Sequence, residues 1–476
     1  MSIDRPNILL ITTDQHNAEI MGCAGNHVVQ TPHLDRLAED GMLFSAAYTP
    51  HPYCTPARTT IFTGLYGHRH KVMYNMNLRE DRMDPPEWTG LGADVLAFPE
   101  ILAQHGYRTS FFGKLHTKQM EDKALGLEFM RLAEGKGQFV DYGTAPDDYR
   151  QYLLDRGYPP DIWRTWELPA YGRLGYVTSP LPVEDYIDTW TASEALRYLD
   201  EVDEPFFSWV SFSGPHTPWD PPRPYDTMYT PNEIPLPVRR EGELEEKHPR
   251  WVARLARTVP AIPPRSTDPS VEGGIDRAYE RLSEEETRAM LAAYYGQISL
   301  IDAQIGRLLD DLDGRGVRDH TVVLFTSDHG DYLGNNWAFY KYGAPYESLA
   351  RVPFIVSWPG VLASDQRSDA LVSLTDVAPT FLELAGVSAV PDMDGRSLTP
   401  LLLGEQVRWR DAVFVDAGQL RAIMTPTWKY IRWQDGFEES YNRKEDPHDL
   451  YNLARRPQSR SVCGELAARL AEFGEV

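Results

Sequence analysis

Short apolar runs along the chain predict strands. Runs rich in β-branched and aromatic residues lie at Asn7 to Thr12, Tyr107 to Phe112, Phe206 to Phe212, Thr321 to Thr326 and Val352 to Ser357. Continuous apolar runs of this length are typical of interior strands in a parallel sheet. The pattern therefore predicts a largely parallel sheet.

Helical patterns separate these strands. Apolar residues recur every three or four positions from Glu184 to Asp200 and from Ser283 to Leu312. Two shorter helices are predicted from Thr31 to Gly41, with Thr31 as the N-cap, and from Pro99 to Gly106. Strands that alternate with helices predict an α/β fold, with a large, mostly parallel sheet flanked by helices.

The pattern changes near Leu401. The short runs Ala412 to Val415 and Trp428 to Trp433 predict a small antiparallel sheet, and a terminal helix follows. We therefore expect residues 1–400 to form the main α/β domain and residues 401–476 to form a small α+β subdomain. Segments Gly135 to Pro180 and Arg223 to Ser270, rich in Pro, Trp and Tyr, are predicted to be loops over one rim of the sheet.

Charge and composition exclude several classes of protein. The 476 residues include 47 Lys and Arg against 70 Asp and Glu, a net charge of −23, which disfavours nucleic acids and anionic membranes as partners. No apolar run approaches the roughly 20 residues that span a bilayer, and Ile8 to Ile11 is too short for a signal peptide. Three scattered cysteines, Cys23, Cys54 and Cys463, predict no disulfide framework. We expect a cytoplasmic protein, and a homo-oligomer is left open.

Polar side chains follow two of the predicted strands. Asp14 and Gln15 come after the first strand, and Asp328 and His329 after Thr321 to Thr326. Because ligands gather at the carboxyl ends of strands in such sheets, we expect these side chains to converge. Their oxygen atoms favour Ca²⁺ or Mg²⁺, and the imidazole admits Mn²⁺. The alternative for Asp14 is a helix N-cap.

A single cysteine stands at a predicted helix start. In Cys54-Thr55-Pro56-Ala57-Arg58, the cysteine would lie at the positive end of the helix, beside a guanidinium that can bind an oxyanion. The alternative is a buried cysteine without a role. The string, with Thr63-Gly64 after it, resembles the sulfatase signature Cys-x-Pro-Ser/Ala-Arg then Thr-Gly, whose cysteine is oxidised to formylglycine.

The resemblance covers most of the chain. Similar blocks follow in family order at Asn7 to Gln15, Thr31 to Ala38, Gly106 to His116, Pro215 to Trp219, Ser327 to Gly330, Arg351 to Gly360 and Thr375 to Thr380. On these blocks the chain is identified as a member of the sulfatase branch of the alkaline-phosphatase superfamily. The looped segments and most of the C-terminal part have no counterpart in these blocks.

The resemblance implies one divalent metal ion. Asp14, Gln15, Asp328 and His329 fall on the family's metal positions, together with the formylglycine made from Cys54. Sulfatases usually bind Ca²⁺. Many relatives carry Asp where Gln15 stands and Asn where His329 stands, so Mn²⁺ and Mg²⁺ are the alternatives.

The resemblance also implies a nucleophile and its cations. Cys54, as hydrated formylglycine, would attack sulfur with one hydroxyl, and the other would then release sulfate and restore the aldehyde. Arg58 would neutralise and position this nucleophile. Lys114 and Lys341 would hold the sulfate oxygens.

Two histidines and an asparagine complete the implied site. His116 falls on the base that helps break the covalent intermediate, and His216 on the residue that contacts the leaving oxygen. Asn75 would face the substrate, and its neighbour Asn77 is the alternative.

The implied function is hydrolysis of a small sulfate monoester by an arylsulfatase-like enzyme that a formylglycine-generating enzyme matures. Phosphonate monoester hydrolases and phosphodiesterases share the nucleophile motif, Asp-Gln and Asp-His, but tend to lack the Lys-x-His pair present as Lys114 and His116. A non-catalytic binder of sulfated ligands, with Cys54 as a thiol, is a third hypothesis; the completeness of the polar site disfavours it. Aromatic residues of the looped segments could wall a substrate pocket or pack the rim: Trp163, Trp166, Tyr171, Tyr176, Trp219, Tyr225 and Trp251.

Overall fold

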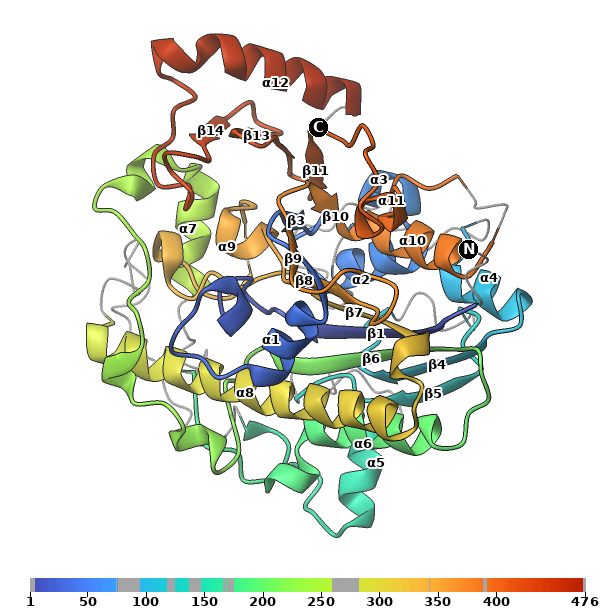
Figure 1. Cartoon of the computed structure of the whole chain (residues 1–476). Helices are drawn as coiled ribbons and strands as arrows, with labels where there is room; N and C mark the ends of the chain where they lie inside the picture. The colour runs from blue at the N-terminus through green and yellow to red at the C-terminus, as the bar shows by residue number, and fades with distance from the viewer. Residues whose placement is uncertain are drawn as a thin grey trace.

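The computed structural model describes residues 5–73, 75, 95–117, 125–136, 147–165, 168, 175–258, 282–341, 343–387 and 392–473. Its centre is an eight-stranded sheet of order β5-β4-β6-β1-β7-β8-β2-β9. The strands are β1 (Asn7–Asp14), β2 (Gly41–Phe44), β4 (Arg108–Gly113), β5 (Phe129–Leu132), β6 (Phe206–Pro215), β7 (Thr321–Ser327), β8 (Phe354–Ser357) and β9 (Gln366–Ser368). The predicted α/β fold is confirmed (Figure 1).

Strand β1 lies in the middle of this sheet. It runs parallel to β6 on one side and to β7 on the other, with Leu10 opposite both Trp209 and Leu324. Strand β8 departs from the prediction of parallel interior strands, because it pairs antiparallel with both β7 and β2. A buried apolar run gives no information on direction, so the sequence could not distinguish the two pairings.

The two faces of the sheet are covered by different helices. Ile8 and Leu10 pack in one apolar cluster, whereas Leu9 and Ile11 pack in another, as the alternation along a strand requires. The first cluster contains residues of α2 (Cys54–Thr63), α4 (Phe98–Gln104) and α10 (Val377–Leu384). The second contains residues of α1 (Pro32–Glu39), α6 (Ile187–Leu199) and α8 (Glu284–Gly314). Figure 1 shows these two helical layers on opposite sides of the sheet.

The starts of two helices are stabilised differently. Helix α8 begins with a capping box, in which Ser283 accepts from the amide of Glu286 and the Glu286 side chain accepts from the amide of Ser283. The predicted start of α1 is confirmed, because Thr31 is the N-cap residue and Pro32 is the first helical residue. The Thr31 side chain makes no capping bond, however, and Asp302 of α8 accepts from the amides of His33 and Leu34 instead. This long-range cap leaves no local sequence signal.

The C-terminal part forms the predicted antiparallel sheet, β11 (Val413–Asp416), β12 (Leu420–Met424), β13 (Trp428–Trp433) and β14 (Glu438–Asn442), with α12 (Arg460–Phe473) packed on it. Its other face shares an apolar cluster with β3 (Ala47–Tyr48) and α9 (Glu347–Ala350). A small parallel pair joins β3 to β10 (Val372–Ser373), and short helices lie at α3 (Gly67–His70) and α11 (Thr399–Leu402).

The looped segments are only partly loops. Helix α5 (Asp148–Asp155) lies in the first and α7 (Pro249–Thr258) in the second, so the prediction of loops alone is wrong. Among the described helices, none combines the length and apolarity that a bilayer crossing requires.

Candidate active site

Cys54 occupies the first position of a buried helix. Tyr53 precedes it in extended conformation, and Cys54 is the first residue of α2, with no exposed surface. The helix start is capped from outside, because Asn75 Oδ1 accepts a hydrogen bond of 3.0 Å from the Thr55 amide. Asn75 therefore lies beside Cys54 and orders the turn that carries it. Asn77 lies outside the described residues.

Arg58 joins two carboxylates from neighbouring strands. Asp14 ends β1 and Asp328 follows β7, so the parallel pairing of these strands brings both to one edge of the sheet. Arg58 Nη2 lies 3.1 Å from Asp14 Oδ2, and its Nε lies 3.0 Å from Asp328 Oδ2. Its Nη1 donates to the backbone oxygen of Lys114 at 2.6 Å and to Ser211 Oγ at 2.7 Å. This buried guanidinium is thus fixed by four acceptors.

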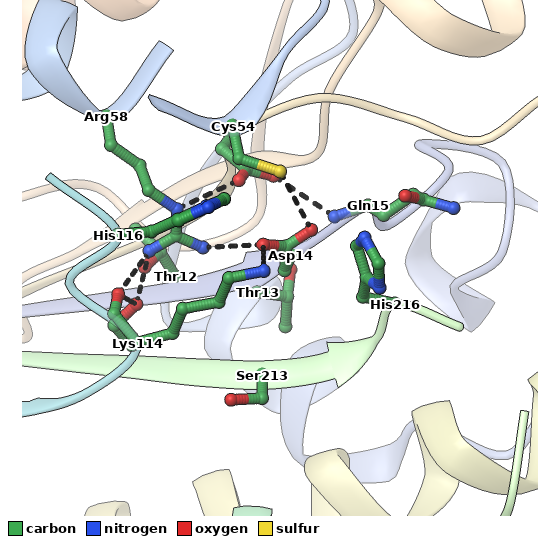
Figure 2. Close-up of polar contacts among 12 residues, drawn as sticks. Thr12, Thr13, Asp14, Gln15, Cys54, Arg58, Lys114, His116, Ser213 and His216 are labelled. Atoms are coloured by element: carbon green, nitrogen blue, oxygen red, sulfur yellow. Dashed lines mark hydrogen bonds and ion pairs between the residues drawn. The ribbon is translucent and has the colours of Figure 1, made fainter. Parts of the chain in front are cut away.

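Two lysines approach the same place from other segments. Lys114 Nζ lies 2.6 Å from Asp14 Oδ2, in an ion pair that Figure 2 marks with a dashed line. Lys341 Nζ lies 2.6 Å from Cys54 Sγ and 3.9 Å from Asp14 Oδ1. Although burial alone would raise the pKa of Asp14, the charges of Lys114 and Lys341 lower it well below its usual range. The edge of the sheet is therefore a compact group of opposite charges.

The two candidate histidines flank Asp14 in the view of Figure 2. His116 has a positive φ of 50°, and its amide donates to the Glu134 carboxylate at 3.0 Å. His216 follows β6, with its Nδ1 2.6 Å from the Thr217 carbonyl oxygen, so Nδ1 carries the proton and Nε2 does not. Burial and nearby lysines lower the pKa of both histidines well below its usual value, so both rings are neutral at neutral pH.

The candidate metal ligands also converge. One donor atom from each of Asp14, Cys54, Asp328 and His329 lies within 4.8 Å of the others, and all four residues are buried. His329 Nδ1 lies 2.8 Å from the Gly330 carbonyl oxygen, which leaves Nε2 as the nitrogen with a lone pair, 3.3 Å from Cys54 Sγ. Asp14 does not cap a helix, since the next helical turn begins at Gly22.

Gln15 supports a cation at this place. Its backbone has a positive φ of 71°, and its Nε2 donates to Asp331 Oδ2 at 2.5 Å. The other amide atom, Oε1, is buried and has no hydrogen-bond partner. An orphaned amide oxygen beside two carboxylates and a neutral imidazole is a donor set that fits a divalent cation.

The thiol of Cys54 is held in its neutral form. Burial and the charge of Asp14 raise its pKa to about 11. At neutral pH the unmodified side chain is therefore a protonated thiol, which is a weak nucleophile.

Three residues that hold the site were not among the predicted site residues: Ser211, Glu134 and Asp331. Each of them forms a hydrogen bond with another residue of the site, and such supporting contacts have no fixed spacing along the sequence. Asp331 alone had a signal, because it stands two residues after His329.

Some aromatic residues of the looped segments are buried in apolar clusters, and others are partly buried at the edges of these clusters. Trp163, Trp219 and Trp251 are buried in apolar clusters, which accounts for them as packing residues. Tyr176 and Tyr225 are partly buried against two of the same clusters. Trp166 and Tyr171 lie outside the described residues.

Comparisons with known proteins match almost the whole chain. The model of the Sulfatase family matches residues 6–387, and the model "N-sulphoglucosamine sulphohydrolase, C-terminal" matches residues 335–475. An arylsulfatase of Clostridium perfringens is 30% identical over 481 residues, covering 94% of this chain and 90% of that protein.

Solved structures share the fold over nearly the whole chain. The phosphonate monoester hydrolase of Agrobacterium radiobacter superposes with a TM-score of 0.81 at 26% identity, covering 98% of this chain and 95% of that one. A protein solved with its substrate D-glucosamine-2-N,6-O-disulfate superposes with a TM-score of 0.74, covering 99% and 97%; at 22% identity this shows the fold alone.

Proposed function

The chain belongs to the sulfatase family and is a sulfuric-ester hydrolase, and we propose that it cleaves a small sulfate monoester with formylglycine made from Cys54 as the nucleophile. The observation that carries the proposal is the approach of two ammonium groups to one buried point. Lys341 lies 2.6 Å from Cys54 Sγ, and Lys114 lies 2.6 Å from Asp14 Oδ2. Two cations close to a nucleophile suit a substrate that carries an oxyanion.

The sulfur atom of Cys54 stands in for the oxygen atoms of the hydrated aldehyde. Asp14, Gln15, Asp328 and His329, with residue 54, would hold one divalent ion. When bound, the ion supplies positive charge that acidifies the nucleophile and polarises the sulfate group. We propose Ca²⁺, because oxygen atoms dominate the donor set. Mg²⁺, which also prefers oxygen, and Mn²⁺, which accepts the imidazole, are the alternatives to test.

The chain's own residues have separate tasks in this proposal. Arg58 holds Asp14 and Asp328 in place and balances their charge. Lys114 and Lys341 bind the oxygens of the sulfate group, on which negative charge builds up in the transition state. Their burial excludes water, which strengthens these interactions.

The two histidines act on protons. His216, whose Nδ1 is tied to the Thr217 carbonyl, presents Nε2 to the ester oxygen, which must gain a proton as it leaves. His116, neutral at neutral pH, accepts a proton when the covalent intermediate breaks. Asn75 shapes the substrate side of Cys54 through its bond to Thr55.

A phosphonate monoester hydrolase is the second candidate, because the Agrobacterium enzyme superposes with a TM-score of 0.81. Lys114 and His116 favour sulfate, because phosphonate monoester hydrolases and phosphodiesterases tend to lack this Lys-x-His pair. The test is the ratio of kcat/KM for 4-nitrophenyl sulfate to kcat/KM for 4-nitrophenyl phenylphosphonate, measured with converted, metal-loaded protein. We expect a ratio above one. A ratio below one would reverse the order of the two candidates, and no sulfate release from any ester would reject the leading one.

Cys54→Ser provides the matched control for the nucleophile. A serine can accept the sulfate group but has no second hydroxyl with which to expel it. We expect a single stoichiometric release of 4-nitrophenol without turnover.

Other parts of the proposal concern the whole protein. A formylglycine-generating enzyme would convert Cys54 in the cytoplasm, and the three unpaired cysteines, Cys23, Cys54 and Cys463, suit such a reducing compartment. Residues 1–400 would form the catalytic unit and residues 401–476 a subdomain; a separate four-stranded sheet in the second part supports this division.

A further inference from the structure

The carboxylate of Asp331 connects two parts of the active site. It is fully buried, and its Oδ2 accepts from Gln15 Nε2 at 2.5 Å. Its Oδ1 accepts from the amides of Leu333 at 2.8 Å and Tyr340 at 2.9 Å. One side chain thus holds both the residue after β1 and the loop that ends at Lys341.

The bond to Gln15 decides which way its amide faces. A carboxylate can only accept, so the NH₂ group of Gln15 must point toward Asp331. The oxygen Oε1 is then directed elsewhere, and it is the buried atom without a hydrogen-bond partner. Only this orientation offers oxygen, rather than an NH₂ group, to a cation.

The bonds to Leu333 and Tyr340 hold a loop that needs support. Leu333, Asn336, Trp337 and Tyr340 all have positive φ angles, between 52° and 63°. Such conformations are strained in residues other than glycine, and they persist only where the surroundings enforce them. Through its bond to the amide of Tyr340, Asp331 fixes the backbone of the loop at the residue before Lys341.

We propose that Asp331 is a positioning residue that orients the Gln15 amide for the metal ion and fixes the loop that presents Lys341. The proposal rests on the proposed function, because it takes Gln15 as a ligand of that ion. It also accounts for the amide at position 15. A carboxylate there would face the carboxylate of Asp331, and two like charges in a buried contact are costly.

An isosteric exchange tests the first part. In Asp331→Asn the introduced oxygen can still accept from Leu333 and Tyr340, but an NH₂ group now faces Gln15. The Gln15 amide must rotate, so that its own NH₂ group faces the ion. In Gln15→Glu two carboxylates face each other. In the double variant the NH₂ group at position 331 donates to the carboxylate at position 15. The second oxygen of that carboxylate then faces the ion.

Metal affinity is the readout. Chelator-stripped protein is titrated with Ca²⁺, and in parallel with Mn²⁺, by calorimetry and by thermal unfolding. We expect each single variant to bind about tenfold or more weakly, and the double variant to bind as tightly as the original protein. Asp226→Asn, at a carboxylate bonded to Thr178 far along the chain from the site, is the control for the exchange itself.

Turnover at saturating metal tests the second part. Asp331→Asn keeps the loop bonds, so its kcat should recover when the ion is in excess. Asp331→Ala loses them, and its kcat should stay about 100-fold down, as after loss of Lys341.

The outcomes separate the two proposals. If the original protein binds neither Ca²⁺ nor Mn²⁺, the metal part of the proposed function fails. If it binds one of them and Asp331→Asn binds that ion equally well, the role of Asp331 is rejected. The same holds if the loss of metal affinity in the double variant equals the sum of the losses in the two single variants. Equal recovery of kcat in Asp331→Asn and Asp331→Ala would reject the role in the loop.

Discussion

The ammonium group of Lys341 lies 2.6 Å from the sulfur of Cys54, although 287 positions separate the two residues in the sequence. The contact joins the start of α2 to the loop after β7. Burial alone would lower the pKa of Lys341, but Cys54, Asp14 and Asp328 raise it on balance, so the lysine stays charged. A fixed positive charge therefore stands where the nucleophile meets the substrate.

Loss of this charge should slow chemistry more than it weakens binding. For Lys341→Ala we expect kcat on 4-nitrophenyl sulfate to fall by about 10²- to 10³-fold, because charge on the sulfate oxygens grows in the transition state. Steady-state kinetics of converted protein measures this. Lys444→Ala, at an exposed lysine, is the control. A rise in KM with kcat unchanged would instead make Lys341 a binding residue only.

Arg58 should be essential for the stability of the metal-free protein. Replacement by Met leaves Asp14 and Asp328 without their buried partner, at an expected cost of about 3–5 kcal/mol in the free energy of unfolding. Added Ca²⁺ should recover part of the loss, because the ion neutralises the same carboxylates. Denaturant unfolding with and without chelator tests both points.

Arg36→Met is the matched control for Arg58. Its side chain is 39% exposed in an ion pair with Asp313, so we expect a loss of no more than about 1 kcal/mol. Equal losses of unfolding free energy in the two variants would show that the buried ion pairs of Arg58 stabilise the protein no more than an exposed pair does.

The effect of His216 should depend on the leaving group. A residue that protonates the leaving oxygen matters most when that oxygen is basic. We therefore expect His216→Ala to lower kcat/KM for an alkyl sulfate by about 10²- to 10⁴-fold, and for 4-nitrophenyl sulfate by far less. His27→Ala, at an exposed histidine, should change neither value. Equal losses on both esters would assign His216 to another step.

Glu134 should make stability depend on pH. Burial raises its pKa from 4.5 to about 7 in the folded protein. Between these values the folded state holds more protons than the unfolded chain, so this group reduces stability as the pH rises. Glu134→Gln removes the effect, and the variant should gain about 3 kcal/mol relative to the original protein between pH 4.5 and 7.5.

The test for Glu134 is chemical denaturation across this pH range. Exposed Glu405→Gln should show no such gain. A constant difference between Glu134→Gln and the original protein at every pH would contradict the raised pKa of this carboxyl.

Much of the fold could be predicted because local patterns carry it. The β1 run is continuously apolar because the strand is buried on both faces, and α8 shows apolar residues at every third or fourth position. The antiparallel direction of β8 and the cap that Asp302 gives to α1 could not be predicted, because both depend on partners distant in sequence. Local pattern gives elements, whereas direction and long-range caps come from tertiary structure.

The candidate site divides in the same way. Residues at strand ends, such as Asp14 and Asp328, could be proposed from topology, and the motif around Cys54 from resemblance. Supporting residues could not, since Glu134 bonds to a backbone amide and Ser211 to a guanidinium, and neither contact has a fixed spacing. Asn75 was predicted only as a substrate residue, and the structure adds a bond by which its side chain caps the start of α2.

The most direct test of the central claim is mass spectrometry of the peptide that spans Cys54. The protein is made with and without a formylglycine-generating enzyme, and activity on 4-nitrophenyl sulfate is measured on the same samples. We expect a loss of about 18 Da at Cys54 in the active samples, with activity proportional to the converted fraction. Undiminished hydrolysis by protein with an unmodified thiol would contradict the account and assign the chemistry to another group.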